Sequence, residues 1–383
     1  MGIHMKPGQG LLAVLLVSAF FISTNEVVWA ADSWAADPKT GYQIAWVSDV
    51  TTLAAVSWSG PAVDNKAEGK GALTVTVRSK DGKDLQGQGD AEMKAGKLDG
   101  KVSIKWADGS SYDGEYKAGV RDGKGLQRAT TGVTYEGEWK NGLHSGKGVM
   151  KWPNGAIFDG EWANDVPEGQ GVYKTARDSY QGEWKKGKRE GKGTYKTADG
   201  RTYEGEFKNN LMGGKGIYRF PDGQVYEGEV KNDRRDGKGI NKLPDGRVYE
   251  GDFRDDTFNG HGVIRSPDGT TQEGDFVNGA AEGKGILKTP DGRVYEGDFL
   301  KSKRTGKGIL RFPDGARYEG DFVDGKRTGK GIFRFPDGTR YEGDFLDADF
   351  HGYGILYGPG GNILTRGKYQ DGKLVAPAAG AVE

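Results

Sequence analysis

The chain has 383 residues, of which 67 are glycine and 34% are hydrophobic, and its mean hydropathy is −0.71. These figures are lean for the large cores that two or three globular domains of this total length would need. Basic and acidic residues both number 55, so no net charge attracts nucleic acid, and the absence of cysteine excludes disulfides, thiol catalysis and zinc–thiolate sites.

The first thirty residues follow the order of a secretory signal peptide. Lys6 precedes an apolar run at 11–22, and the small residue Ala30 stands shortly before Asp32. The apolar run is short for a membrane span. We therefore expect residues 1–30 to be a signal peptide cleaved near Ala30, and the protein to be exported to the periplasm or secreted. An N-terminal membrane anchor is the alternative.

Two weakly patterned segments follow. Residues 31–57, with Trp34 and Trp46 among alternating apolar residues, are long enough for two or three capping strands. Residues 58–111 show the spacing of a repeat without its aromatic residues, as Ala91 illustrates. We expect this second segment to hold degenerate repeats, because the terminal units of an array are usually atypical.

A pentapeptide of the form aromatic, acid, glycine, acid, aromatic then recurs from 112 to 363. It opens at Tyr112, Tyr135, Phe158, Tyr180, Tyr203, Tyr226, Tyr249, Gln272, Tyr295, Tyr318 and Tyr341. The step is 23 residues, except for one step of 22 after Phe158. A period in this range predicts an array in which each unit contacts mainly its neighbours. A partial repeat at 364–375 and a disordered tail at 376–383 are expected to end the chain.

Each unit reads as two short strands with alternating polarity, bounded by glycine, proline and aspartate. In the unit that opens at Tyr318, alternation places Tyr318, Gly320 and Phe322 on one face and Glu319 and Asp321 on the other. Pro336-Asp337-Gly338 then turns the chain towards the next hairpin. The expected register pairs Gly320 with Gly331, Phe322 with Gly329, and Asp321 with Lys330.

These observations predict an all-β fold. The expected architecture is an elongated, single-layer antiparallel sheet of stacked 23-residue hairpins, forming a curved and twisted rod. Equivalent aromatic residues would line one face of that sheet, with interruptions at Val230 and Gln272.

The repeated unit resembles a known motif. The run 135–142, followed by Gly146-Lys147-Gly148, is similar to the MORN (membrane occupation and recognition nexus) repeat, as are 203–216 and 318–331. The resemblance covers about 58–373 and suggests a bacterial, exported member of the family. It implies a non-catalytic scaffold that binds membranes or protein partners.

The residues offer little catalytic chemistry. His144, His261 and His351 occupy different positions in separate repeats, so they are not expected to converge on a metal or a nucleophile. The paired carboxylates recur in every unit beside a lysine, which favours a solvated charged face over a hydrolase site. Gly-Lys-Gly lacks the spacing and the following Ser or Thr of a phosphate loop. We expect no enzyme activity, no metal site and no cofactor.

Two sets of residues remain as candidate sites. The aromatic row of the last repeats is a candidate partner-binding groove: Tyr295, Phe299, Tyr318, Phe322, Tyr341 and Phe345. The basic hairpin ends beside it are candidate anion-binding tips: Lys303, Arg304, Lys326 and Arg327. Packing between neighbouring hairpins and ordinary solvation are the competing explanations.

The leading hypothesis is an exported scaffold that binds a protein partner through the aromatic groove. The alternatives are a peripheral binder of anionic membrane lipids through the basic tips, and a binder of cell-wall glycan through stacked rings. A nucleic acid partner is not expected, and a homodimer is left open.

Overall fold

The computed structural model describes residues 32–48 and 51–378. The expected signal peptide and its cleavage site near Ala30 lie outside these ranges, as does most of the expected tail. The described residues form two compact units. The N-terminal unit holds the residues up to 198 together with 207–210, and the C-terminal unit holds 199–206 and the residues from 211 onward. Within the described ranges no helix is long and apolar enough to cross a membrane.

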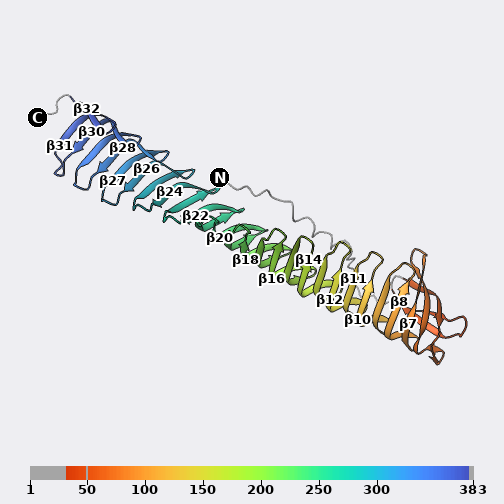
Figure 1. The fold of residues 1–383 in the computed structure, drawn as a ribbon. Coiled ribbons are helices and arrows are strands. Elements are labelled where there is room, and N and C mark those ends of the chain that lie inside the picture. Colours follow the sequence, from red (N-terminus) through yellow and green to blue (C-terminus); the bar gives the residue numbers. More distant parts are fainter. Residues whose placement is uncertain (1–31, 49–50, 379–383) are drawn as a thin grey trace. The chain divides into compact units, whose positions relative to one another are not determined.

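The N-terminal unit is built on one antiparallel sheet in which consecutive hairpins follow chain order (Figure 1). Its strands are β3 (Thr51–Trp58), β6 (Gly69–Ser79), β7 (Asp84–Lys94), β8 (Lys97–Trp106), β9 (Ser111–Lys117), β10 (Val120–Arg128), β11 (Thr134–Lys140), β12 (Leu143–Lys151), β13 (Ile157–Ala163), β14 (Val166–Lys174), β15 (Asp178–Lys185) and β16 (Lys188–Thr197). We counted β3 with the cap, but it pairs with β6 and begins this sheet.

The C-terminal unit repeats the same arrangement. Its strands are β18 (Leu211–Arg219), β19 (Val225–Lys231), β20 (Arg234–Lys242), β21 (Val248–Arg254), β22 (Thr257–Arg265), β23 (Thr271–Val277), β24 (Ala280–Lys288), β25 (Val294–Leu300), β26 (Lys303–Arg311), β27 (Arg317–Val323), β28 (Lys326–Arg334), β29 (Arg340–Leu346), β30 (Asp349–Tyr357), β31 (Ile363–Gln370) and β32 (Lys373–Pro377). Strand β17 (Thr202–Lys208) contains residues of both units. The all-β prediction of consecutive antiparallel hairpins is confirmed.

A small second sheet forms the N-terminal cap. It contains β1 (Asp32–Ala36), β2 (Gln43–Val47), β5 (Lys66–Ala67) and β4 (Ala62–Val63), in that order. The buried carboxylate of Asp37 accepts hydrogen bonds from the backbone N–H groups of Trp58 and Lys39, both at 2.7 Å. These bonds tie the cap to the end of β3.

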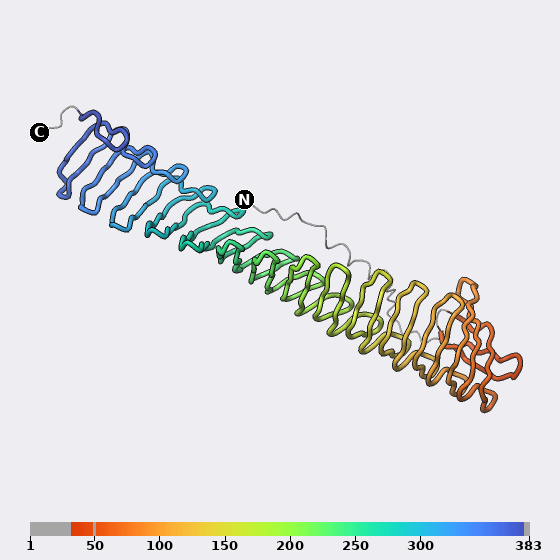
Figure 2. The backbone as a smooth tube through the Cα atoms, viewed as in Figure 1, coloured from red at the N-terminus to blue at the C-terminus, as the bar shows by residue number. Residues whose placement is uncertain are grey.

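Two kinds of turn connect the strands, and the chain reverses at both edges of each sheet (Figure 2). Asp324 and Gly325 form a two-residue turn with φ of 48° and 84°, a conformation that favours Asp-Gly in tight hairpins. At the opposite edge Gly338 N donates to Phe335 O at 3.1 Å, and Phe335 N donates to Thr339 O at 2.8 Å. The turn expected at Pro336-Asp337-Gly338 is therefore present.

The register was predicted only in part. Gly320 pairs with Gly331 as expected, but the two-residue turn pairs Phe322 with Arg327 and Asp321 with Thr328. Gly329 and Lys330 consequently form a bulge, and the other two expected pairs are wrong. The error came from treating 323–328 as a loop, which hid the Asp-Gly turn.

The expected pairing of an aromatic residue with a glycine, and of an acid with a lysine, does occur, but with a strand of the preceding hairpin. Strand β27 pairs Phe322 with Gly306 and Asp321 with Lys307 of β26. An aromatic residue thus lies opposite a glycine, and a carboxylate opposite a lysine. These contacts connect one repeat to the next, because they join strands of neighbouring hairpins.

Candidate interaction surfaces

The aromatic face of the repeats lies in the interior. The six residues of the predicted groove are between 0% and 4% exposed: Tyr295, Phe299, Tyr318, Phe322, Tyr341 and Phe345. The Tyr318 hydroxyl donates to the Asp321 carbonyl at 3.0 Å, which brings the ring back over its own strand. That ring meets Phe322 edge-on, with 5.2 Å between centroids, and covers Gly331 so closely that a Cβ there would lie 2.5 Å away.

The prediction of an open aromatic groove is therefore corrected. The glycines leave room for each tyrosine ring to lie flat against the backbone, and the rings of successive repeats pack against one another. Tyr295 touches Phe322, and Tyr318 touches Phe345, with centroids 4.9 and 4.8 Å apart. Burial raises the pKa of Tyr295 to about 12 and raises that of Tyr318 as well. These rings form the core, and partners must bind elsewhere.

The arginines of the predicted tips also point inwards. The Arg304 guanidinium lies 5.6 Å from the centroid of the Tyr295 ring and 5.7 Å from that of Phe322. Its Nη2 donates to the carbonyl of Gly325 in the next turn, at 2.6 Å. Arg327 makes equivalent contacts one repeat later. Burial lowers the pKa of both arginines from the ordinary value. Each arginine connects consecutive repeats by cation–π contacts and a hydrogen bond.

The lysines of the tips are paired with carboxylates. Lys303 Nζ lies 2.9 Å from Asp324 Oδ1, and Lys326 Nζ lies 2.9 Å from Asp347 Oδ1. All four side chains are between 62% and 69% exposed, so each pair contributes little to stability. The expectation of four available cations is corrected, since the two arginines are half-buried over aromatic rings and the two lysines each face an acid.

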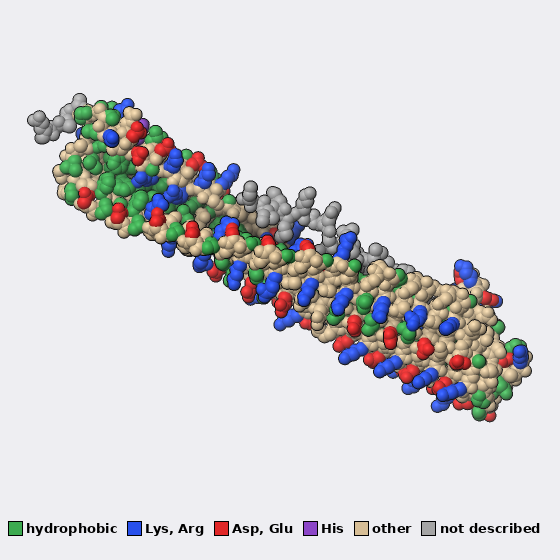
Figure 3. All heavy atoms as spheres, in the orientation of Figure 1, with side chains coloured by type: hydrophobic (Ala, Val, Ile, Leu, Met, Phe, Trp, Pro, Cys, Tyr) green, Lys and Arg blue, Asp and Glu red, His purple; other side chains and the backbone are tan. Residues whose placement is uncertain are grey.

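The opposite face of the sheet carries an alternating row of acids and lysines. Asp321 Oδ2 accepts the backbone N–H of Lys330 at the bulge, at 3.1 Å, and its Oδ1 lies 2.6 Å from the Nζ of Lys307 in the preceding hairpin. The Gly-Lys-Gly motif is thus the bulge of each hairpin, and the recurring acid satisfies its backbone. Rows of basic and acidic side chains run across the strands of the N-terminal unit in Figure 3.

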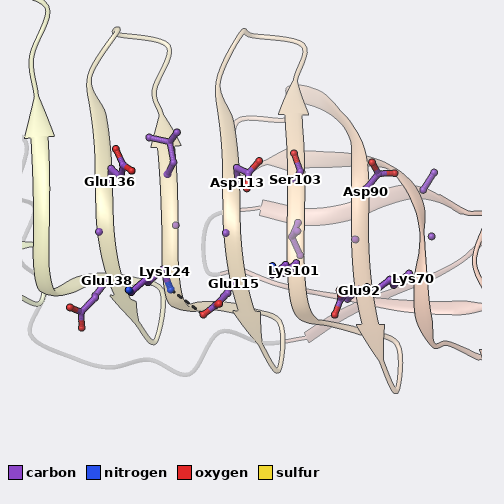
Figure 4. A pocket seen from close by; sticks show the side chains of 18 of the residues that line it. Lys70, Asp90, Glu92, Lys101, Ser103, Asp113, Glu115, Lys124, Glu136 and Glu138 are labelled. Atoms are coloured by element: carbon purple, nitrogen blue, oxygen red, sulfur yellow. Dashed lines mark hydrogen bonds and ion pairs between the residues drawn. The ribbon is translucent and has the colours of Figure 1, made fainter.

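A shallow groove with a volume of about 1230 Å³ lies on this charged face of the N-terminal unit. Figure 4 shows its side chains pointing away from the sheet in two rows. In one row lysines alternate with glutamates, such as Lys101, Glu115 and Lys124; the other holds Asp113 and Glu136. The groove is open and charged along its length.

The histidines lie far apart in sequence and make unrelated contacts. The His144 ring packs 3.8 Å from the Tyr135 ring, between centroids, and its Nδ1 lies 3.0 Å from Asp165 Oδ1. His261 Nδ1 lies 3.3 Å from Asp275. His351 pairs across the strands with a residue of β29. In the described part of the chain, no group of three His, Asp or Glu side chains could hold a metal ion.

One feature of the surface was missed by the sequence analysis. Four aliphatic residues at the same repeat position are between 48% and 56% exposed, and we call them the apolar row: Val277, Leu300, Val323 and Leu346. Each is the last residue of its strand and follows a buried phenylalanine, so alternation points it to the charged face. Figure 3 shows hydrophobic side chains gathered over the last strands of the C-terminal unit.

The signal for this row was present in the sequence. The equivalent residues of the earlier repeats are Lys117, Lys140, Ala163, Lys185, Lys208, Lys231 and Arg254. From 277 onward the position changes from a charged residue to Val or Leu while the period of 23 is kept. The search for aromatic and basic residues overlooked it because the change affects a single position per repeat.

Solved structures that are similar to this chain include the following two. One is the TCP domain of SAS-4 (dCPAP) from Drosophila melanogaster, in complex with a proline-rich motif of Ana2 (dSTIL). It is 17% identical with a TM-score of 0.26, over 45% of this chain and 86% of that domain. The other is the G-box domain of the microcephaly protein CPAP, 12% identical with a TM-score of 0.11, over 64% of this chain and 93% of that one. No curated protein matched the sequence.

A family model for the MORN repeat matches eleven consecutive segments between residues 112 and 363. The matched segments are 112–134, 135–157, 158–177, 180–200, 203–225, 226–246, 249–271, 273–292, 295–317, 318–340 and 341–363. They cover more than half of the chain and coincide with the hairpins described above. Proteins of this kind are generally non-enzymatic interaction scaffolds, and this chain belongs to the MORN repeat family.

Proposed function

We propose that this chain is an exported, non-enzymatic scaffold that binds a protein partner on its C-terminal unit. The family supports a scaffold, and the N-terminal order of Lys6, apolar run and Ala30 supports export. The binding surface is the apolar row, which replaces the aromatic groove that we first expected.

The apolar row is the observation that carries this proposal. Charged side chains keep the surface of such an array solvated, and the earlier repeats carry lysine or arginine at this position except for Ala163. Four consecutive repeats instead expose Val or Leu, so the exposure is regular and confined to one stretch. Exposed apolar residues that recur regularly on one surface among polar ones are a candidate protein interaction site.

The lipid alternative has less support from the structure. Lys303 and Lys326 each face a carboxylate, and Arg304 and Arg327 cover aromatic rings. Anionic headgroups would have to displace Asp324 and Asp347 before they met these lysines. A protein surface can bury Leu and Val without breaking any of these pairs.

The test replaces residues of the apolar row with lysine, which occupies this position in most of the earlier repeats. A Leu300→Lys/Val323→Lys variant should fold normally and lose a partner that is cross-linked to the wild-type chain in the native envelope. Val375→Lys is the matched control, because Val375 is 54% exposed but lies on β32. If the row variant retains the same partner, this proposal is wrong. Binding to anionic vesicles that salt abolishes would favour the lipid alternative.

Export has its own test. The N-terminal sequence of the native protein should begin near Asp32, and the chain should fractionate with the envelope or the medium. A native chain that still begins at Met1 in a soluble internal fraction would rule export out.

A further inference from the structure

We propose that the apolar row binds an extended polyproline II segment, which runs across the strands with an apolar side chain at every third residue. This inference rests on the proposed function and specifies the kind of partner. The row consists of Val277, Leu300, Val323 and Leu346, at the ends of β23, β25, β27 and β29.

The spacing of the row selects this conformation. Consecutive members lie on alternate strands, and strands are about 4.8 Å apart, so the members are about 9.6 Å apart. A polyproline II chain rises about 3.1 Å per residue with three residues per turn, so every third side chain points the same way at about 9.3 Å. Over the three steps of the row the accumulated mismatch is only about 1 Å.

Two other conformations fit less well. In an α-helix, residues seven apart share a face, but their separation of about 10.5 Å accumulates a mismatch of about 3 Å over the row. In a β-strand, every third side chain changes face, so consecutive members of the row cannot all be met. Among these conformations only polyproline II, with three residues per turn, points every third side chain the same way at the spacing of the apolar row.

The backbone around the row supports the same choice. Strand β27 pairs with β26 on one side and with β28 on the other, and β25 is likewise paired on both sides. A partner that crosses these strands therefore finds no unpaired ladder of N–H and C=O groups to extend. A polyproline II segment needs none, because its backbone is solvated and contacts are made by side chains.

Charges along the row give the segment a direction. Lys301 follows Leu300 and Asp349 lies opposite Leu346, while Lys303 and Asp347, which also flank these two residues, are each paired with a side chain of a neighbouring hairpin. Asp324 and Lys326 flank Val323 between them, so this middle position carries both signs. A segment whose acidic end lies beside Leu300 and whose basic end lies beside Leu346 is complementary to this gradient.

The probe is a labelled proline-rich peptide with four leucines at every third position, acidic residues at one end and basic residues at the other. Two control peptides of the same composition carry the leucines at every fourth position, or at seven-residue spacing in a helix-forming sequence. Fluorescence anisotropy with the full mature chain measures binding. We expect the in-register peptide to bind at least ten-fold more tightly than either control.

Variants connect the binding to the row. Val323→Lys should weaken binding of the in-register peptide at least ten-fold, whereas Val375→Lys should leave it unchanged. A Lys301→Glu variant should weaken binding of a peptide whose acidic end is fixed beside Leu300, and a peptide with basic residues at both ends should recover it.

The outcomes separate this inference from the proposed function. If the helical peptide binds more tightly, or if the in-register peptide fails to bind, the polyproline II assignment is wrong. The proposed function survives that result if Leu300→Lys/Val323→Lys still abolishes partner cross-linking. If the row variant affects neither the peptide nor the partner, both are wrong. Concentration-dependent dimerisation that Val323→Lys removes would instead assign the row to a second copy of the chain.

Discussion

Repeats that carry glutamate after the central glycine differ from those that carry aspartate. The glutamate repeats contain Glu115, Glu138, Glu161, Glu183, Glu206 and Glu229; the aspartate repeats contain Asp252, Asp275, Asp298, Asp321 and Asp344. In four repeats of each kind the carboxylate accepts a backbone N–H at the bulge of its own hairpin, as Glu138 does from Lys147 and Asp321 from Lys330. The acid therefore has one structural task in common.

Only the aspartates also reach the lysine of the preceding hairpin. Lys238, Lys284, Lys307 and Lys330 lie 2.5 to 2.7 Å from an aspartate oxygen. Among the described residues, Lys124, Lys147 and Lys215, which face glutamates, make no such ion pair. The longer glutamate folds back over the bulge, and Glu138 Oε2 would lie 2.4 Å from a Cβ on Gly146. From residue 112 onward the ion pair therefore accompanies the shorter acid, whereas in the degenerate repeats Glu92 also reaches Lys70, at 3.2 Å.

This difference coincides with the change in the apolar row. Three of the four repeats of the apolar row, those with Leu300, Val323 and Leu346, pair their aspartate with a lysine of the preceding hairpin, whereas Asp275 in the repeat with Val277 faces His261. Charge is reduced on the surface where apolar side chains are exposed. The glutamate repeats keep a lysine at the hairpin end, except for the one with Ala163. The two kinds of repeat have the same strand arrangement and differ in the side chains that they expose.

The largest expected effect tests whether the backbone is the same in both regions. Gly137→Val and Gly320→Val should each destabilise the fold by about 3 kcal/mol, since a Cβ on Gly320 would lie 2.4 Å from the Tyr318 hydroxyl and 2.6 Å from Gly331 Cα. Glu319→Gln should cost under about 1 kcal/mol, because its ion pair with Arg317 is exposed. Thermal unfolding measures all three. Equal melting temperatures for Gly320→Val and Glu319→Gln would contradict the face assignment.

The next effect is confined to the N-terminal region. Burial raises the pKa of Asp37, but hydrogen bonds from the N–H groups of Trp58 and Lys39 outweigh it, so the pKa is below its ordinary value. The stabilisation is therefore complete above the unfolded pKa of about 4 and is lost as the pH falls through the lower folded value. Asp37→Asn should cost about 2 kcal/mol at neutral pH.

Denaturant unfolding at several pH values checks this sign. The difference between wild type and Asp37→Asn should shrink as the pH is lowered below about 4. A difference that grows in acid, or that is the same at every pH, would show that Asp37 is not a charged tie.

A smaller effect lies in the aspartate region, where the tyrosine row is interrupted. Gln272 replaces a tyrosine, and its buried Nε2 has no hydrogen-bond partner among the described residues. Gln272→Tyr should raise the free energy of unfolding by about 1 kcal/mol, because it fills the missing ring position and removes an unsatisfied donor. Tyr249→Gln creates the same gap in an intact repeat and should cost about 3 kcal/mol. A destabilised Gln272→Tyr would indicate that this repeat has repacked around glutamine.

Much of this fold could be predicted from the sequence. The period of 23 identified the hairpins, and alternation placed Tyr318 and Phe322 opposite Glu319 correctly. The predicted strand register was wrong beyond Gly320, because the tight turn at Asp324-Gly325 was not recognised. That turn shifts the pairing and produces the bulge at Gly329, which the alternation of polar and apolar residues does not reveal. The same turn determines which hairpin supplies the lysine for Asp321, so the repeat-to-repeat contacts could not be derived without it.

The candidate site was harder to predict for a related reason. Alternation shows which side chains lie on the same face of a strand. It does not show whether that face is exposed to solvent, and here the aromatic face is buried. Tyr318 was therefore expected on an open surface, but it lies in the core. Arg327 was expected to be free, but its guanidinium lies over the Tyr318 ring. The apolar row could be seen in the sequence as a change from a mostly basic position to Val or Leu. Its exposure could not be inferred without knowing that the aromatic face is the buried one.

The smallest expected effect tests the comparison directly. Asp321→Glu should release Lys307 from its ion pair, and Glu138→Asp should create one with Lys124, which pairs with that position across the strands. Each exchange keeps the bulge hydrogen bond and changes one exposed ion pair, so stability should change by under about 1 kcal/mol. Because a paired ammonium is less available as a free amine, limited amine acylation read by mass spectrometry should label Lys307 faster in Asp321→Glu and Lys124 more slowly in Glu138→Asp. Lys303, whose partner Asp324 is unchanged, supplies the internal reference. Unchanged labelling in both variants would mean that the length of the acid does not control these lysines, and the distinction between the two kinds of repeat would lose its physical basis.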